Sequence, residues 1–226
     1  MDIALNYVEK GSGEALLLLH GNGEDLSYFE HQVPEFSRCF RVIALDTRGH
    51  GKSPRGNAPF SIAQFADDLA GFMDGLGIAR AHILGFSDGA NIALAFALKY
   101  PSRVNRLILD GGNLRPSGVK FFVQLPIVLG YGICSLISLF DKKAIVKKEL
   151  LGLMVTQPNL RPSDLSGMKI PTLVVAGTDD MIKTSHTKEI HRAIPGSRLA
   201  LIEGDHFVAN KNPSAFNAAV LEFLLG

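Results

Sequence analysis

The chain contains no tryptophan, and only 8% of its 226 residues are aromatic. Rows of exposed aromatic side chains that could stack on bases or sugars are therefore not expected. An excess of one charge is also missing, because 23 lysine and arginine residues face 22 aspartate and glutamate residues, giving a formal net charge of +1. Since nucleic-acid-binding proteins concentrate positive charge, the sequence argues against a nucleic-acid partner.

Cysteine is scarce, with Cys39 and Cys134 far apart and without the spacing of a metal or redox site. We interpret both as reduced, partly buried thiols, which is typical of a cytoplasmic protein. The first residues also lack a basic segment followed by an apolar run. No signal peptide is therefore expected, and the predicted location is the cytoplasm.

The most informative stretch is residues 81–90, AHILGFSDGA. An apolar strand runs into Gly85-x-Ser87-x-Gly89, and a helix of small and apolar residues follows. Glycine has no Cβ, so a strand and a helix can pass closely at a sharp turn. Such a turn lifts the Ser87 hydroxyl above the sheet, beside the first N–H groups of the helix. The plainer alternative is an ordinary strand–turn–helix in which Ser87 only caps the helix.

Short apolar runs alternate with helical patterns along most of the chain. Residues 3–8 could add a first strand, and strands are predicted at 15–19, 41–45, 81–86, 104–109, 173–176 and 199–202. Helical patterns lie between these strands, and one amphipathic helix is predicted to follow the capping sequence that begins at Ser61. This order predicts an α/β protein with a mostly parallel sheet and helices on both faces. The functional site is then expected at the carboxyl ends of the strands.

Residues 113–168 break the alternation, and we predict that they form a small helical lid inserted into a single domain of residues 1–226. Residues 119–140 are nearly long enough and apolar enough to span a bilayer, but Gln124, Pro126 and two glycines interrupt them. A membrane span is therefore not expected. Four lysines follow: Lys142, Lys143, Lys147 and Lys148. They could touch an anionic membrane surface, but a water-facing lid is the preferred interpretation, so membrane contact is not expected either.

Five motifs occur in an order that resembles the α/β-hydrolase fold, in particular its serine-nucleophile members, which are esterase- and lipase-like. They are His20-Gly21-Asn22-Gly23, Asp46-x-Arg48-Gly49-His50-Gly51-x-Ser53, Gly85-x-Ser87-x-Gly89, Gly177-x-x-Asp180 and Gly204-Asp205-His206-Phe207. The resemblance implies a sheet of about seven or eight strands. Because the N-terminus is short, we expect seven, with the antiparallel strand that usually opens the fold missing.

The resemblance also implies roles for individual residues. Ser87 is the expected nucleophile, His206 the base that takes its proton, and Asp180 the acid that orients His206. The main-chain N–H groups of Asn22 and Asp88 are the expected oxyanion hole. Two other carboxylates compete for the place of the acid, since Asp179 adjoins Asp180 and Asp110 also ends a strand.

Other polar residues have less specific interpretations. His20, Arg48 and His50 resemble residues that hold the loops together. The side chain of Asp88 caps the following helix or, alternatively, meets an ammonium group of a substrate. Three further histidines are expected to face water: His31, His186 and His191.

The expected activity is therefore that of a serine hydrolase. It would cleave a small to medium carboxylic ester, or a related acyl compound, through an acyl-enzyme, with no metal and no organic cofactor. The expected partner is the small-molecule substrate alone. Three alternatives stay open: a thioesterase, a carbon–carbon bond hydrolase, or a ligand-binding protein that has the fold without catalysis.

Overall fold

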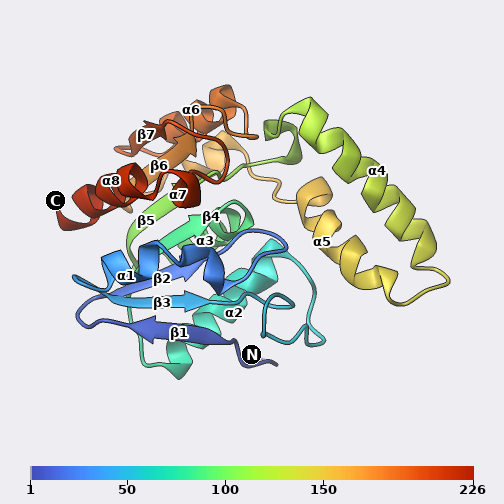
Figure 1. Cartoon of the computed structure of the whole chain (residues 1–226), viewed down its shortest axis with the longest axis horizontal. Coiled ribbons are helices and arrows are strands. Elements are labelled where there is room, and N and C mark those ends of the chain that lie inside the picture. Colours follow the sequence, from blue (N-terminus) through green and yellow to red (C-terminus); the bar gives the residue numbers. More distant parts are fainter. Residues whose placement is uncertain (1) are drawn as a thin grey trace.

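The computed structural model describes residues 2–226, and its centre is a seven-stranded sheet (Figure 1). The strand order is β1-β3-β2-β4-β5-β6-β7. Neighbouring strands from β3 to β7 in that order are parallel, whereas β1 is antiparallel to β3. The strands are β1 (Tyr7–Lys10), β2 (Ala15–Leu19), β3 (Arg41–Leu45), β4 (Ala81–Phe86), β5 (Val104–Asp110), β6 (Thr172–Gly177) and β7 (Arg198–Ile202).

The mostly parallel sheet and the count of seven strands agree with the sequence, but the expected loss of the antiparallel strand is wrong. Strand β1 pairs with β3 from Tyr7 opposite Leu45 to Lys10 opposite Val42. All four residues of β1 are exposed, so no buried apolar pattern indicates it. Main-chain pairing holds this edge strand, together with an ion pair of 2.9 Å between Arg41 and Glu9.

The inner strands are apolar because both faces of the sheet are covered. Side chains alternate between the faces, so Leu17 and Ile43 enter one core while Leu16 and Val42 enter the other. Helices α2 (Ile62–Gly75), α3 (Asp88–Lys99) and α6 (Thr184–Ala193) cover the first face. The second face is covered by η1 (Leu26–Phe29), α1 (Gln32–Phe36), α7 (Val208–Lys211) and α8 (Pro213–Leu225).

Two helices between β5 and β6, α4 (Phe121–Ile137) and α5 (Ala144–Thr156), form a hairpin that stands apart from these layers (Figure 1). The side chain of Gln124 on α4 donates a hydrogen bond of 3.0 Å to the carbonyl of Met154 on α5. The expected interruption is not found, because α4 runs continuously through Pro126 and both glycines. A search of residues 2–226 finds no helix long and apolar enough to cross a membrane.

Parallel strands bring the loops that carry the predicted motifs to one edge of the sheet. His20 follows β2, Asp46 follows β3 and Ser87 follows β4. Asp110 ends β5, while Asp180 and His206 come shortly after β6 and β7. The candidate site therefore lies at the carboxyl ends of the strands.

Candidate active site

Ser87 stands at the turn from β4 into α3 with φ 53° and ψ −118°, and it is the one non-glycine residue among residues 2–226 with a positive φ. The flanking glycines make this turn possible. A Cβ on Gly85 would lie 2.2 Å from the carbonyl oxygen of Gly89, and a Cβ on Gly89 would lie 2.1 Å from that of Leu19. The strained backbone is thus fixed by close packing on both sides, an arrangement that proteins keep mainly at functional sites.

Three of the predicted site residues form a continuous chain of contacts. His206 Nε2 lies 3.0 Å from the Oγ of Ser87, and His206 Nδ1 lies 2.7 Å from Oδ1 of Asp180. Asp180 Oδ1 also accepts a hydrogen bond of 2.8 Å from the main-chain N–H of Ile182, which fixes the carboxylate. Asp180 and His206 are both buried. The imidazole is therefore held between a hydroxyl and a carboxylate, the geometry of a serine activated by a base.

The two competing carboxylates do not take this position. Asp179 points to the surface, where it forms an ion pair of 2.9 Å with Lys120. Asp110 is completely buried, and neither of its carboxyl oxygens has a hydrogen-bond partner within residues 2–226. Burial raises the pKa of Asp110 well above its usual value, and the nearby negative charges of Asp180 and Glu24 raise it further. Both effects favour the neutral form of this carboxyl group.

Residues that the sequence did not single out help to place His206. Gly111 has φ +61°, and a Cβ there would lie 2.7 Å from Cε1 of His206. The ring of Phe86 lies 4.8 Å from the His206 ring and stacks on Tyr28 at 4.2 Å between ring centres. The pair of glycines after β5 was the available signal for Gly111, whereas nothing in the sequence pattern distinguished Tyr28 from other core residues.

The loops that carry Asn22 and Asp88 touch each other. Asn22 Nδ2 donates hydrogen bonds to Oδ2 of Asp88 at 2.8 Å and to the carbonyl of Leu150 at 2.9 Å. Asn91 Nδ2 donates to the other carboxylate oxygen of Asp88 at 3.1 Å. Asp88 is the first residue of α3, so its N–H belongs to the turn that has no partner within the helix. Two amides thus occupy the Asp88 carboxylate, which favours a structural role for its side chain.

His20, Arg48 and His50 connect the surrounding loops. His20 Nε2 accepts a hydrogen bond of 3.0 Å from the N–H of Thr47, and its Nδ1 lies 2.7 Å from the carbonyl of Gly21. Burial lowers the pKa of His20 to about 4, so the ring is neutral. Arg48 is fully buried and binds Asp68 through two hydrogen bonds of 2.6 Å. His50 Nδ1 lies 3.1 Å from the hydroxyl of Thr47.

The prediction that His186 faces water is wrong. Its ring is buried, Nε2 accepts a hydrogen bond of 3.0 Å from the N–H of Leu114, and Nδ1 lies 2.8 Å from Glu189. The segment before α4 packs directly on this side of α6, and a Cβ on Gly118 would lie 2.3 Å from the His186 ring. His191 is half-buried against Ser197, and His31 is exposed as expected.

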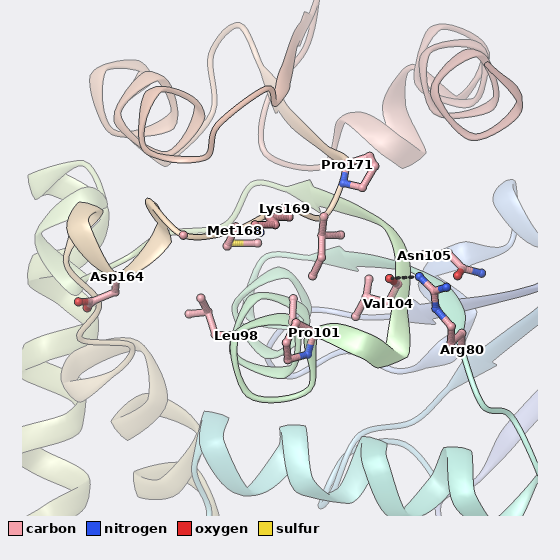
Figure 2. A pocket seen from close by; sticks show the side chains of 12 residues that line it. Arg80, Leu98, Pro101, Val104, Asn105, Asp164, Met168, Lys169 and Pro171 are labelled. Atoms are coloured by element: carbon pink, nitrogen blue, oxygen red, sulfur yellow. Dashed lines mark hydrogen bonds between the residues drawn. The ribbon is translucent and has the colours of Figure 1, made fainter.

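A cavity of about 550 Å³ lies at the opposite edge of the sheet (Figure 2). Val104 at the start of β5 and Pro171 just before β6 line it, and Arg80 reaches across to the carbonyl of Val104. Ser87, Asp180 and His206 are not among its lining residues. Within residues 2–226 no three histidine, cysteine or acidic side chains gather as metal ligands would.

Comparison with known proteins gives consistent results. Residues 14–131 match the family model described as the alpha/beta hydrolase fold. The chain is 31% identical to "Putative carbamate hydrolase RutD" of Caulobacter sp., with 94% of this chain and 91% of that protein covered. It is 27% identical to 3-oxoadipate enol-lactonase 2 of Acinetobacter baylyi, with 97% and 92% covered. The crystal structure of an enol-lactonase from Burkholderia xenovorans superimposes with a TM-score of 0.80 at 26% identity, covering 99% and 97%.

Proposed function

The chain belongs to the alpha/beta hydrolase fold family, and from this premise we propose that it is a serine hydrolase of a small to medium carboxylic ester or a related acyl compound. The observation that carries the proposal is the chain of contacts from Ser87 through His206 to Asp180. A serine hydroxyl becomes a useful nucleophile when an imidazole takes its proton. The likeness to hydrolases, including a lactonase that by its name opens a cyclic ester, supports the same class of reaction.

In the proposed reaction, Ser87 Oγ attacks the acyl carbon while His206 Nε2 takes the hydroxyl proton. The main-chain N–H groups of Asn22 and Asp88 bind the oxyanion that forms. The tetrahedral intermediate then expels the alcohol, which receives the proton from His206. Water attacks the acyl-enzyme by the same route and releases the carboxylic acid and free Ser87. Asp180 keeps Nδ1 protonated throughout and stabilises the imidazolium.

We also propose that residues 113–168 act as a lid in a single domain. Helix α5 lies above the carboxyl edge of the sheet, where Leu150 accepts the hydrogen bond from Asn22 and Glu149 pairs with Arg55. The substrate would therefore bind between this segment and Ser87. The protein acts without a metal or an organic cofactor in this proposal, and its partner is a small molecule.

A carbon–carbon bond hydrolase is the second candidate. A meta-cleavage product hydrolase from Pseudomonas fluorescens superimposes on this chain with a TM-score of 0.80 at 26% identity, covering 98% of this chain and 94% of that one. A diketone would then replace the ester. Ser87, activated by His206, would attack one carbonyl carbon, the bond from that carbon to its neighbour would break, and His206 would give the proton to the carbon that leaves. Water would then release the acid from Ser87. The two candidates share the residues at the site, so the substrate distinguishes them.

The test is hydrolysis of p-nitrophenyl esters from acetate to decanoate by the wild type, by Ser87→Ala and by the control Ser102→Ala, whose serine is exposed in the turn that precedes β5. We expect turnover by the wild type and the control, and a loss of about 10⁴-fold or more in kcat for Ser87→Ala. Labelling by a fluorophosphonate should disappear in parallel. Labelling without ester turnover would favour the second candidate, and its diketone substrates are then assayed. If the wild type shows no ester turnover and no labelling, both candidate functions are refuted.

A further inference from the structure

The α4–α5 hairpin presents a continuous apolar face to solvent. Helix α4 packs on α5 through Gln124 and Tyr131, and buries Cys134. Its other face carries no charge. The large apolar side chains that are exposed on α4 are Phe121, Phe122, Leu125, Val128, Leu129, Ile133, Leu136 and Ile137. A helix that faces water normally places polar residues there, so this face has the composition of a contact surface.

The face continues past α4 into the turn of the hairpin. Leu139 is 72% exposed and Phe140 is 93% exposed, and Ile145 and Val146 extend the apolar surface onto α5. Six positions recur at spacings of three or four residues and so line one stripe: Phe122, Leu125, Leu129, Ile133, Leu136 and Phe140. Helix α4 and the turn of the hairpin project away from the sheet and its covering helices (Figure 1), and the exposed side chains lie along the whole length of α4.

Positive charge accompanies this apolar surface. Lys142, Lys143 and Lys147 are exposed around the turn, where Asp141 is the only acidic neighbour in sequence before Glu149. Glu149 is already paired with Arg55. Among residues 2–226 the lysines in ion pairs lie elsewhere, at Lys99, Lys120 and Lys211. The lysines of the turn are therefore available to a negatively charged partner.

An apolar helix face bordered by exposed lysines is complementary to an anionic lipid surface. Apolar side chains enter the boundary of the acyl chains while the lysines bind the headgroups. No described helix can cross the bilayer, so the hairpin would lie in the interface. A second copy of the chain fits less well, because the patch that a two-fold contact would use twice offers only Asp141 as an acidic partner for its lysines.

We propose that the outer face of the α4–α5 hairpin docks this protein on anionic membranes. This changes the interpretation of the segment from the sequence, in which the lysines were assigned to a water-facing lid and membrane contact was not expected. Helix α4 instead places its large apolar side chains on a common outer face. The proposal does not depend on the catalytic role of Ser87.

The experiment is co-sedimentation of the full chain with vesicles of phosphatidylcholine, with or without phosphatidylserine. The wild type should bind vesicles that contain phosphatidylserine, and should bind those of phosphatidylcholine alone at least about tenfold more weakly. Two triple variants should each lose about tenfold or more in affinity. They are Leu136→Ser with Leu139→Ser and Phe140→Ser, and Lys142→Glu with Lys143→Glu and Lys147→Glu.

The matched control reverses three exposed lysines elsewhere, as Lys10→Glu with Lys169→Glu and Lys188→Glu. It has the same net charge as the second variant and should bind within about twofold of the wild type. Ser87→Ala should bind like the wild type, so a failure of the catalytic proposal leaves this result intact. Circular dichroism checks the fold of each variant. If the variant with three serines does not fold, the variant with three lysines reversed to glutamate tests the proposal alone.

Equal binding to both kinds of vesicle, or loss of binding in the control as in the lysine variant, would overturn the proposal. So would a wild type that does not sediment with anionic vesicles. Sedimentation velocity without lipid supplies the remaining outcome: a dimer that the apolar substitutions dissociate would show that a second copy covers this face instead.

Discussion

The side-chain amide of Asn22 donates a hydrogen bond of 2.9 Å to the main-chain carbonyl of Leu150. The loop after β2 is thereby attached to α5, across 128 residues of sequence. A second attachment lies nearby, where Arg55 forms a forked ion pair with Glu149 at 2.5 and 2.8 Å. Two loops at the carboxyl edge of the sheet thus hold the middle of α5, and the position of α5 bears directly on the site.

Replacing Arg55 by Ala should loosen α5 and raise KM for the ester substrate. The pair is partly exposed, so we expect a loss in unfolding free energy of about 1 kcal/mol or less, and a rise in KM of about threefold to fivefold with little change in kcat. Steady-state kinetics and urea unfolding measure the two effects. Arg38→Ala, which removes an exposed pair with Glu35 far from the site, is the control and should leave KM unchanged. An unchanged KM for Arg55→Ala would show that α5 does not border the substrate.

The two buried carboxylates should differ strongly in how much the same isosteric change lowers kcat. Asp180→Asn removes the charge that faces Nδ1 of His206, and kcat should fall by about 10³- to 10⁴-fold. Asp110 makes no hydrogen bond to His206, and burial raises its pKa and so favours its neutral form, so Asp110→Asn should keep kcat within about tenfold. Measuring kcat for ester hydrolysis by the two purified variants shows which carboxylate orients His206. A larger loss for Asp110→Asn than for Asp180→Asn would transfer the role of the acid to Asp110.

The turn at Ser87 depends on glycine for steric reasons. A Cβ on Gly89 would lie 2.1 Å from the carbonyl oxygen of Leu19, so β2 and α3 must separate in Gly89→Ala. We expect a loss of about 3 kcal/mol or more in unfolding free energy, measured by urea denaturation. Gly75→Ala is the matched control, because no atom lies within 4 Å of the added Cβ and the residue ends α2. That variant should be neutral or more stable by up to about 1 kcal/mol. Equal stability of the two variants would contradict the steric argument.

Sequence patterns predicted those parts of the fold whose physics is local. Runs such as residues 15–19 and 41–45 are buried on both faces, so their composition alone identifies them as inner strands. The motif at Ser87 places a side chain at a strand end, and the parallel sheet then brings Asp180 and His206 to the same edge. The mostly parallel α/β sheet was therefore predictable from local patterns, whereas the α/β-hydrolase fold was predicted from the resemblance of the motifs at the strand ends.

The remaining features depend on packing between distant segments. Strand β1 is exposed on both faces and is defined mainly by its pairing with β3, so the weak pattern at residues 3–8 overlapped it only at Tyr7 and Val8. His186 is buried by the segment at Gly118, which lies far from it in sequence. The contact of Gly111 with His206 likewise exists only after β5 and β7 take their places in the sheet. The outward direction of the apolar stripe on α4 could not be read from its composition, which is equally that of a buried helix.

The buried ring of His20 should make stability depend on pH. Protonation at Nε2 would remove the hydrogen bond from the N–H of Thr47, and burial lowers the pKa of His20 to about 4. In the unfolded chain the pKa of histidine is about 6.5, so between these values the unfolded state binds more protons. This contribution to stability is therefore fully present above about pH 6.5 and is lost as the pH falls toward about 4, by about 3 kcal/mol in total.

His20→Gln removes this titration and isolates its effect. The variant should be less stable than the wild type near neutral pH, because the bonds to Thr47 and Gly21 are disturbed, and the difference should shrink by about 3 kcal/mol as the pH is lowered to about 4. Urea unfolding at a series of pH values measures the difference. Burial also lowers the pKa values of His50 and His186, but these groups are present in both proteins and cancel. The control is His31→Gln, at an exposed position, whose unfolding free energy should differ from that of the wild type by the same amount at every pH. A constant difference in unfolding free energy between His20→Gln and the wild type would mean that the pKa of His20 is not depressed.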